Sequence, residues 1–424
     1  MSHSIWPRGL LSAASLCALS AVLSTSATPT PALADTAGNA ELTPVIVTAR
    51  LRPEDAQSVP TALDVVTEDV LKSTGTYNIS QLSQRVPSLF YTSPNPRNTA
   101  FTLRGLGSSV VAVSQANDGL EPGVGFYVDQ VYHARPATAA FDMLDVERVE
   151  VLRGPQGTVF GKNTTAGAIN ITTKAPSFTP EIDAEGSIGE ANYRQAKASA
   201  TGPVLGDLLA ARIALVSTQR DGNIQNVRTG GRDNSINTWS VHGQLLYKPS
   251  ATFSLRLSAD YNVIDSTCCT QVHVRVAPTL KSAAKQYPAL AAGQSYTPPS
   301  LDPFQRLTDI DAPVAVDTNE GGLSAIADWD LGKATFTSVT AWRFWNWDAA
   351  NDRDYTGLSI QTLQHIPSRQ DQYSQELRIA SNGHDTVEYV AGLYYFNQGI
   401  TGRPITQYGP LATYWLLGPA PAFP

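Results

Sequence analysis

The chain has 424 residues, with 30 Lys and Arg against 37 Asp and Glu, and a formal net charge of −7. Charged residues make up only 16% of the sequence, which also contains 31 glycines and 28 prolines. This composition excludes a coiled coil, and the acidic balance excludes a nucleic-acid-binding surface. Intrinsic disorder is excluded as well, because 42% of the residues are hydrophobic.

Residues 1–34 have the pattern of a cleaved export signal. Arg8 supplies the positive charge, residues 10–23 are uncharged and mostly apolar, and Ala32-Leu33-Ala34 forms a small-residue cleavage site. The apolar run is too short for a membrane-spanning helix, which needs about 20 residues. We therefore expect a mature chain that starts at Asp35 and crosses a membrane, if it does so, with strands.

Residues 35–54 form a short leading segment that contains an isolated β-branched stretch. This stretch consists of Thr43, Pro44, Val45, Ile46, Val47, Thr48 and Ala49. Such a stretch can add as an extra strand to the sheet edge of another protein. It can also be the first strand of the following domain, and composition alone favours that second interpretation.

Residues 55–175 have mixed α/β patterning with many glycines, which predicts one compact domain. Short helices are expected near 68–71 and 80–83. Strands bounded by turn residues are expected at 99–105, 125–129 and 168–173.

From residue 181 to residue 424 the pattern changes to successive strands of about 9–11 residues, the length that crosses a bilayer at a tilt. Apolar and polar residues alternate most clearly at 253–263, and again at 239–248 and 373–379. Aromatic residues near segment ends are typical of membrane interfaces; we assign this position to Tyr247, Trp342, Trp345, Trp347 and Tyr395.

The connections between these strands favour a transmembrane barrel over a soluble sandwich. Short connections near 203–207, 248–252, 331–333 and 381–385 alternate with long ones at 221–235, 266–317 and 349–366. Outer-membrane barrels have short periplasmic turns and long outer loops, whereas a sandwich has no reason to alternate in this way. We count about nine strands.

Residues 146–174 closely resemble the plug-domain signature of TonB-dependent outer-membrane receptors. In the family's order, residues 43–49 resemble a TonB box, residues 102–105 a plug arginine motif and residues 125–129 a central plug strand. The resemblance implies a mainly β fold, in which an α/β plug at 55–175 precedes an antiparallel barrel at 181–424. Structural roles in the plug are assigned to Arg104, Gly105, Glu147, Glu150, Arg153, Gly154, Gly157 and Gly161.

The resemblance also implies a function: energy-coupled uptake of a scarce ligand, most simply an iron–siderophore complex, in the outer membrane of a Gram-negative cell. TonB would bind residues 43–49, outer-membrane lipid would surround the monomeric barrel, and no cofactor is needed. Plug-apex positions that could contact the ligand are Tyr91, Asn95, Arg97, Gln115 and Asp118. The alternatives are a passive porin-like barrel, which predicts no plug, and a non-functional truncated receptor. The last follows from the strand count, because the family's barrels have 22 strands.

The sequence contains no complete enzyme motif. Residues 157–162 have three residues between the glycines where a phosphate-binding loop requires four, and Lys162 is followed by Asn163. There is no Gly-x-Ser-x-Gly elbow, and no cysteine or histidine spacing predicts a metal site. Cys268 and Cys269 are adjacent; two free thiols and a local redox pair both remain open.

Overall fold

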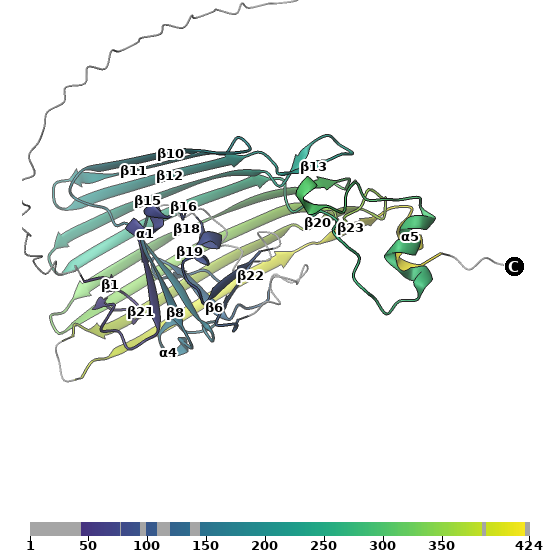
Figure 1. Cartoon of the computed structure of the whole chain (residues 1–424). Helices are drawn as coiled ribbons and strands as arrows, with labels where there is room; N and C mark the ends of the chain where they lie inside the picture. The colour runs from purple at the N-terminus through teal and green to yellow at the C-terminus, as the bar shows by residue number, and fades with distance from the viewer. Residues whose placement is uncertain are drawn as a thin grey trace, which may run out of the picture. The chain divides into compact units, whose positions relative to one another are not determined.

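The computed structural model describes residues 44–76, 78–93, 99–107, 119–135, 145–383 and 387–419. Strands dominate this part of the chain and form a small mixed sheet followed by a long antiparallel sheet (Figure 1). The arrangement confirms the predicted fold class, a small α/β domain followed by an antiparallel sheet of barrel type. The expected export signal at 1–34 lies outside the described residues.

The small domain, called the plug below, is built on a five-stranded sheet in the order β3-β8-β9-β6-β7. β8 is antiparallel to both β3 and β9, whereas β6 runs parallel to β9. The strands are β3 (Leu63–Thr67), β6 (Val124–Val128), β7 (Val131–Tyr132), β8 (Val146–Arg153) and β9 (Gly167–Thr173), with a separate pair β4 (Leu89–Thr92) and β5 (Ala100–Leu103).

Both faces of this sheet are covered, so its central strands are apolar on both sides. Val149 and Ile169 belong to one buried cluster, and Leu152 and Ala168 belong to a second cluster on the opposite face. Glu150 lies on the same face as Leu152, because side chains alternate along a strand. A carboxylate therefore stands in the middle of a buried strand.

Within the described residues, the plug also contains three short helices: α1 (Glu68–Ser73), α2 (Ile79–Leu82) and α4 (Gly157–Phe160). The first two confirm the helices predicted near 68–71 and 80–83. α2 begins with a capping box, in which the Asn78 side chain accepts from the Gln81 backbone and the Gln81 side chain accepts from the Asn78 backbone.

The second sheet, called the wall below, contains eleven strands, all paired antiparallel. Nine of them are long, as the sequence predicted, once the short strands β20 (Gln361–His365) and β23 (Ile405–Tyr408) are set aside. The long strands are β10 (Glu181–Ile188), β11 (Arg194–Leu205), β12 (Leu209–Arg220), β15 (Ile236–Ser250), β16 (Phe253–Ser266), β18 (Ala315–Asp330), β19 (Ala334–Asn351), β21 (Ser368–Ser381) and β22 (Val390–Gly402).

Aromatic side chains form two bands on the convex face of the wall. Tyr261 on β16 lies between Trp239 on the neighbouring β15 and Phe344 on β19, across β18, with ring centroids 5.5 and 6.2 Å apart. Phe253 and Trp329 are paired in register nearer the other end. Phe253 and Tyr261 are eight residues apart on β16, or about 26 Å at 3.3 Å per residue, which matches the apolar band of about 25 Å in outer-membrane barrels.

Two of the aromatic assignments were wrong. Trp345 and Trp347 are only 2% and 4% exposed and pack against Ile264 and Val316 on the concave face. Val339 on β19 packs against the plug and therefore points inward. Because side chains alternate along a strand, the other odd-numbered residues of β19, including Trp345 and Trp347, also point inward.

From β11 onward short and long connections alternate as predicted, whereas the first connection at the long-loop end, 189–193, is short, as the sequence also indicated at 189–192. The short connections at 206–208, 251–252 and 331–333 lie at one end of the wall, called the short-turn end, together with the end of β21 and the start of β22; the long ones lie at the other end. The long connections carry β13 (Ile224–Asn226), β14 (Arg232–Asp233), β17 (Leu307–Thr308), η3 (Ala283–Lys285), α5 (Tyr287–Gly293) and η4 (Pro303–Gln305), and α6 (Ala412–Leu417) lies beyond β23.

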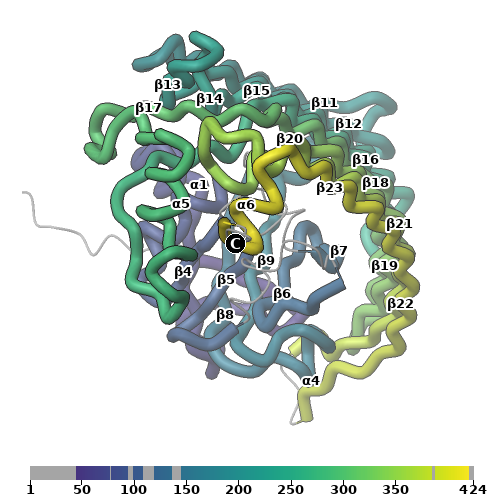
Figure 2. Tube along the Cα trace, turned by 90° about the vertical axis from the view of Figure 1, so that its right-hand side faces the viewer, coloured from purple at the N-terminus to yellow at the C-terminus, as the bar shows by residue number. Residues whose placement is uncertain are grey.

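Viewed from the long-loop end, the wall is an open curve with the plug strands on its concave side (Figure 2). β10 and β22 are its two edges, and within the described part of the chain they do not pair with each other. No helix among the described residues is long and apolar enough to cross a membrane.

Candidate functional site

The segment proposed to bind TonB is folded into a small hairpin in this structure. β1 (Ile46–Val47) pairs antiparallel with β2 (Glu54–Asp55), and the Ala56 amide donates to the Val45 carbonyl over 2.9 Å. Val47 and Ala49 are 0% and 1% exposed within the second plug cluster. Pro44, Val45 and Ile46 are exposed, and Thr43 lies outside the described residues.

A buried carboxylate of the plug holds this segment. Glu150 is 0% exposed, and its Oε1 atom accepts from the Thr48 amide over 2.9 Å and from the Thr48 hydroxyl over 3.2 Å. Arg148 Nε donates to the same oxygen over 2.9 Å, and Asn170 Nδ2 donates to Thr48 Oγ1 over 3.2 Å. The positive guanidinium compensates a carboxylate that would otherwise be costly to bury.

The hairpin also contacts the wall at its short-turn end. Arg52 bridges Glu54 of the hairpin and Glu388 in the turn before β22. Although burial by itself raises the pKa of Glu54, hydrogen bonds from Arg50 and Arg52 lower that pKa below its usual range. A cleft between plug and wall is lined in part by Thr48, Arg52 and Glu388. The segment therefore lies at the end where the wall's turns are short.

The other plug motif residues occupy structural positions. Arg153 pairs with Asp64 over 3.2 Å, Glu147 is exposed and pairs with Arg148, and Arg104 is exposed with a left-handed backbone. Gly105, Gly154 and Gly161 have positive φ angles of 74°, 94° and 76°, and Gly157 begins α4. The positive φ at Gly154, directly after β8, is a conformation that other residues adopt only with strain.

Polar contacts join the plug to the concave face of the wall. Arg212 on β12 forms a bidentate ion pair with Asp145, and both side chains are 4% exposed. Gln244 on β15 donates to Thr173 Oγ1 over 2.8 Å. Gln372 on β21 accepts from the amide of Ala134 over 3.2 Å. Side chains from at least three wall strands thus hold the plug in place.

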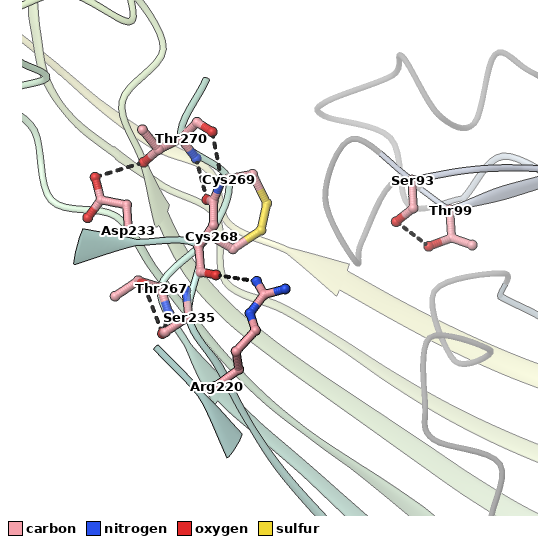
Figure 3. Close-up of a disulfide and its surroundings, with 10 residues drawn as sticks. Ser93, Thr99, Arg220, Asp233, Ser235, Thr267, Cys268, Cys269 and Thr270 are labelled. Atoms are coloured by element: carbon pink, nitrogen blue, oxygen red, sulfur yellow. Dashed lines mark hydrogen bonds between the residues drawn. A yellow bond between two sulfur atoms is a disulfide. The ribbon is translucent and has the colours of Figure 1, made fainter. Parts of the chain in front are cut away.

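The long-loop end contains a disulfide between Cys268 and Cys269 (Figure 3). The two cysteines are therefore bonded to each other in this structure and are not free thiols. Beside them, Thr267 and Ser235 exchange backbone-to-hydroxyl hydrogen bonds of 3.0 Å each way. Cys268 packs against the cluster that contains Trp345. The start of the long connection after β16 is therefore fixed to the loop before β15.

A buried carboxylate joins two further loops at this end. Asp352 is 0% exposed and accepts from the amides of Asp311 and Ala312, each over 3.2 Å, and from that of Tyr355 over 2.7 Å. Burial and the neighbouring Asp354 raise the pKa of Asp352 to about 7. Among the described residues, no group of three or more His, Cys, Asp or Glu side chains is arranged to hold a metal ion.

Of the five ligand-contact candidates, only Tyr91 lies in the described part of the chain. It is on β4 at the edge of the first plug cluster, with its ring centroid 5.4 Å from that of Phe101, and burial raises the pKa of its hydroxyl. Asn95, Arg97, Gln115 and Asp118 lie outside the described residues.

Residues 55–168 match the plug domain of TonB-dependent receptors. The chain therefore contains a domain similar to the plug domain of TonB-dependent receptors. This confirms the resemblance drawn from residues 146–174. The pesticin receptor of Yersinia pestis is 28% identical over 377 residues, which cover 87% of this chain and 50% of that protein. The catecholate siderophore receptor Fiu of Escherichia coli K12 is 28% identical over 153 residues, 36% of this chain and 18% of the relative.

Solved structures share the fold. The ferric yersiniabactin uptake receptor FyuA from Yersinia pestis matches with a TM-score of 0.69 and 23% identity, over 82% of this chain and 50% of that one. The ferripyoverdine receptor of Pseudomonas aeruginosa matches with a TM-score of 0.65 and 14% identity, over 85% and 46%. The chain spans about half the length of the pesticin receptor and of these solved chains. Each of these relatives is named as a receptor rather than as an enzyme.

Sequence reasoning missed two features of the site. It assigned Glu150 a general structural role without a partner, and it did not single out Asp145 and Arg212. A carboxylate in the middle of a buried strand is a signal that was available for Glu150, because such a group needs donors nearby. The partners themselves lie 102 and 67 residues away in sequence, and no local pattern identifies them.

Proposed function

We propose that the protein is an outer-membrane receptor that takes up a scarce ligand, an iron–siderophore complex, with energy delivered by TonB through residues 43–49. Matched relatives are named as siderophore receptors or uptake receptors, which supports the ligand class. The export signal at 1–34 and the two aromatic bands of the wall support a place in the outer membrane.

The observation that carries the proposal is the position of the TonB-box segment. It lies at the short-turn end of the wall, where Arg52 reaches Glu388. Short turns face the periplasm in outer-membrane barrels, so the segment is on the side from which a periplasmic partner approaches. The ligand would bind at the opposite end, among the long loops and the plug apex.

The chemistry of TonB recognition would be strand addition. An incoming strand gains backbone hydrogen bonds from one edge of residues 44–49, and side-chain pockets add specificity. The plug residues hold this segment at the periplasmic side, and the polar wall contacts keep the plug in the lumen. A porin-like function is disfavoured because a plug occupies the concave side of the wall.

Whole-cell uptake of radiolabelled ferric siderophores, in cells with and without TonB, tests the proposal. We expect at least one siderophore to accumulate only when TonB is present. Ile46→Pro removes a backbone donor at an exposed position, and it should abolish uptake while ligand binding to energy-depleted cells stays unchanged. Accumulation that persists without TonB would support the porin alternative instead, and absence of binding by every siderophore tested would exclude the ligand class.

A further inference from the structure

The docked segment offers two backbone edges, and the structure occupies both. Residues 45 and 47 face β2, because the Ala56 amide donates to the Val45 carbonyl and Val47 pairs with Glu54. Backbone groups alternate in direction along a strand, so Ile46 and Thr48 face the other edge. On that edge the Thr48 amide donates to Glu150 Oε1 over 2.9 Å.

An added strand from a partner would need the same Thr48 amide. The β2 edge is already paired, and the Thr48 carbonyl accepts from the Leu51 amide over 2.8 Å to close the turn. A carboxylate is a stronger acceptor than a peptide carbonyl, and this one also bonds the Thr48 hydroxyl. Glu150 is therefore a direct competitor of a pairing strand.

We propose that Glu150 is the positioning residue that keeps residues 45–49 docked on the plug, and that TonB pairs with this segment only after the Glu150 carboxylate has left the Thr48 amide. The inference rests on the proposed function for its second half alone. Its first half concerns the chain by itself, in the absence of ligand and of TonB.

The chain offers a matched control for Glu150. Glu147 is on the same strand and pairs with the same Arg148, but it is exposed and its contact is directed away from the hairpin. Thr48→Val is a second variant, which replaces the hydroxyl that is bonded to Glu150, Asn170 and Arg148 with a methyl group. This change lies in the docked segment and leaves the plug core intact.

The experiment measures the maleimide labelling rate of Val47→Cys, a position that is 0% exposed when docked, in the full chain in outer-membrane vesicles with Cys17 replaced by serine. Loss of a hydrogen-bonded charged acceptor raises the undocked fraction, so E150A should speed labelling by about tenfold or more. T48V should speed it by about threefold, and E147A should leave it unchanged.

A second reporter separates positioning from general plug stability. Val86→Cys is 0% exposed in the first plug cluster, on the other side of the sheet from the hairpin, and its labelling should stay at the parent rate in all three variants. A V47C rate in E150A close to that of the parent overturns the proposal. The proposal is also overturned if labelling of V86C in E150A speeds up as much as labelling of V47C, because Glu150 would then support the plug as a whole.

The second half of the proposal is tested by measuring how tightly the purified periplasmic domain of TonB binds the parent protein and E150A. Apparent affinity is proportional to the undocked fraction, which alone can pair with TonB, so E150A should bind about tenfold more tightly than the parent. Faster labelling with unchanged affinity would overturn the competition between Glu150 and TonB. If the TonB domain bound neither protein while labelling behaved as expected, the proposed function would fail and the docking role of Glu150 would stand.

Discussion

The ion pair between Arg212 and Asp145 gives the strongest test of how the plug is held. It connects β12 of the wall to the residue before β8, it is bidentate, and both side chains are 4% exposed. Removing one partner leaves a buried charge without compensation, which costs about 3–5 kcal/mol. For a unit of this size, that is a fall of roughly 6–20 °C in the melting temperature.

The assay is thermal unfolding of the plug in detergent-solubilised protein, followed by trypsin cleavage within residues 145–174. Arg212→Ala and Asp145→Asn should each lower the cleavage midpoint by that amount. Arg256→Ala is a matched control, because Arg256 also faces the plug but its nitrogen is 3.8 Å from Asp129, beyond hydrogen-bond distance. Its effect should be at most about 1 kcal/mol.

A double replacement refines the test. Exchanging both partners for uncharged residues, as in R212M together with D145N, should restore most of the lost stability, because no charge remains buried alone and Asn tolerates the positive φ of 56° at position 145. The reasoning is refuted if R212A and D145N shift the midpoint no more than R256A does, or if the double variant is as unstable as the sum of the single ones.

Three further outcomes follow from single positions. The pKa of Asp352 is raised to about 7, so between about pH 5 and pH 7 its carboxyl binds a proton in the native state but not in the unfolded state. The loop at 352–361 should therefore lose stability as the pH rises from 5 to 8. Hydrogen exchange should show this trend, and D352N should remove it. The disulfide of Cys268 and Cys269 closes a loop of only two residues, so replacing both with serine should cost only about 1 kcal/mol in a calorimetric scan, and a loss of several kcal/mol would contradict the entropic argument. Gly167 has a φ of +151°, and a Cβ added there would overlap the backbone oxygen of Leu152. G167A should therefore destabilise the plug by at least about 2 kcal/mol in chemical denaturation. G243A should change stability by less than half as much, because a Cβ added at Gly243 meets nothing within 4 Å.

The wall was predictable because each strand carries its own evidence. Alternation along 253–263 fixed which side chains of β16 face outward, and the unequal connections fixed which ends lie together. The same signal failed at 342–347 of β19, where aromatic residues occur on both faces of one strand. On β19 the alternation shows that the strand has two faces but not which face meets the plug. That choice depends on the packing of Val339 against Val131.

The contacts of the site were not predictable, because they join segments that are distant in sequence. Thr48 meets Glu150 across 102 residues, and the pairing of β3, β8 and β9 sets the position of that carboxylate. The plug signature identified Glu150 as a structural residue without naming what it holds. A buried charge predicts that donors are near it, but only the folded sheet shows that one of them is the backbone of the segment proposed to bind TonB.

Two of the plug's junctions lie on β8 or directly before it, and their strengths differ. Asp145, paired with Arg212, directly precedes β8, and Glu150 lies five residues further on, or about 16 Å along the strand. Residues 45–49 are held by one shared carboxylate and by the buried side chains of Val47 and Ala49, whereas the wall junction is a bidentate charge pair. A pull on the segment should therefore open the Glu150 junction first and leave β8 attached to the wall. R212A should then leave V47C labelling at the parent rate even though it lowers the unfolding midpoint; if it sped labelling as E150A does, β8 and the hairpin would open as one cooperative unit and the two junctions would have no separate roles.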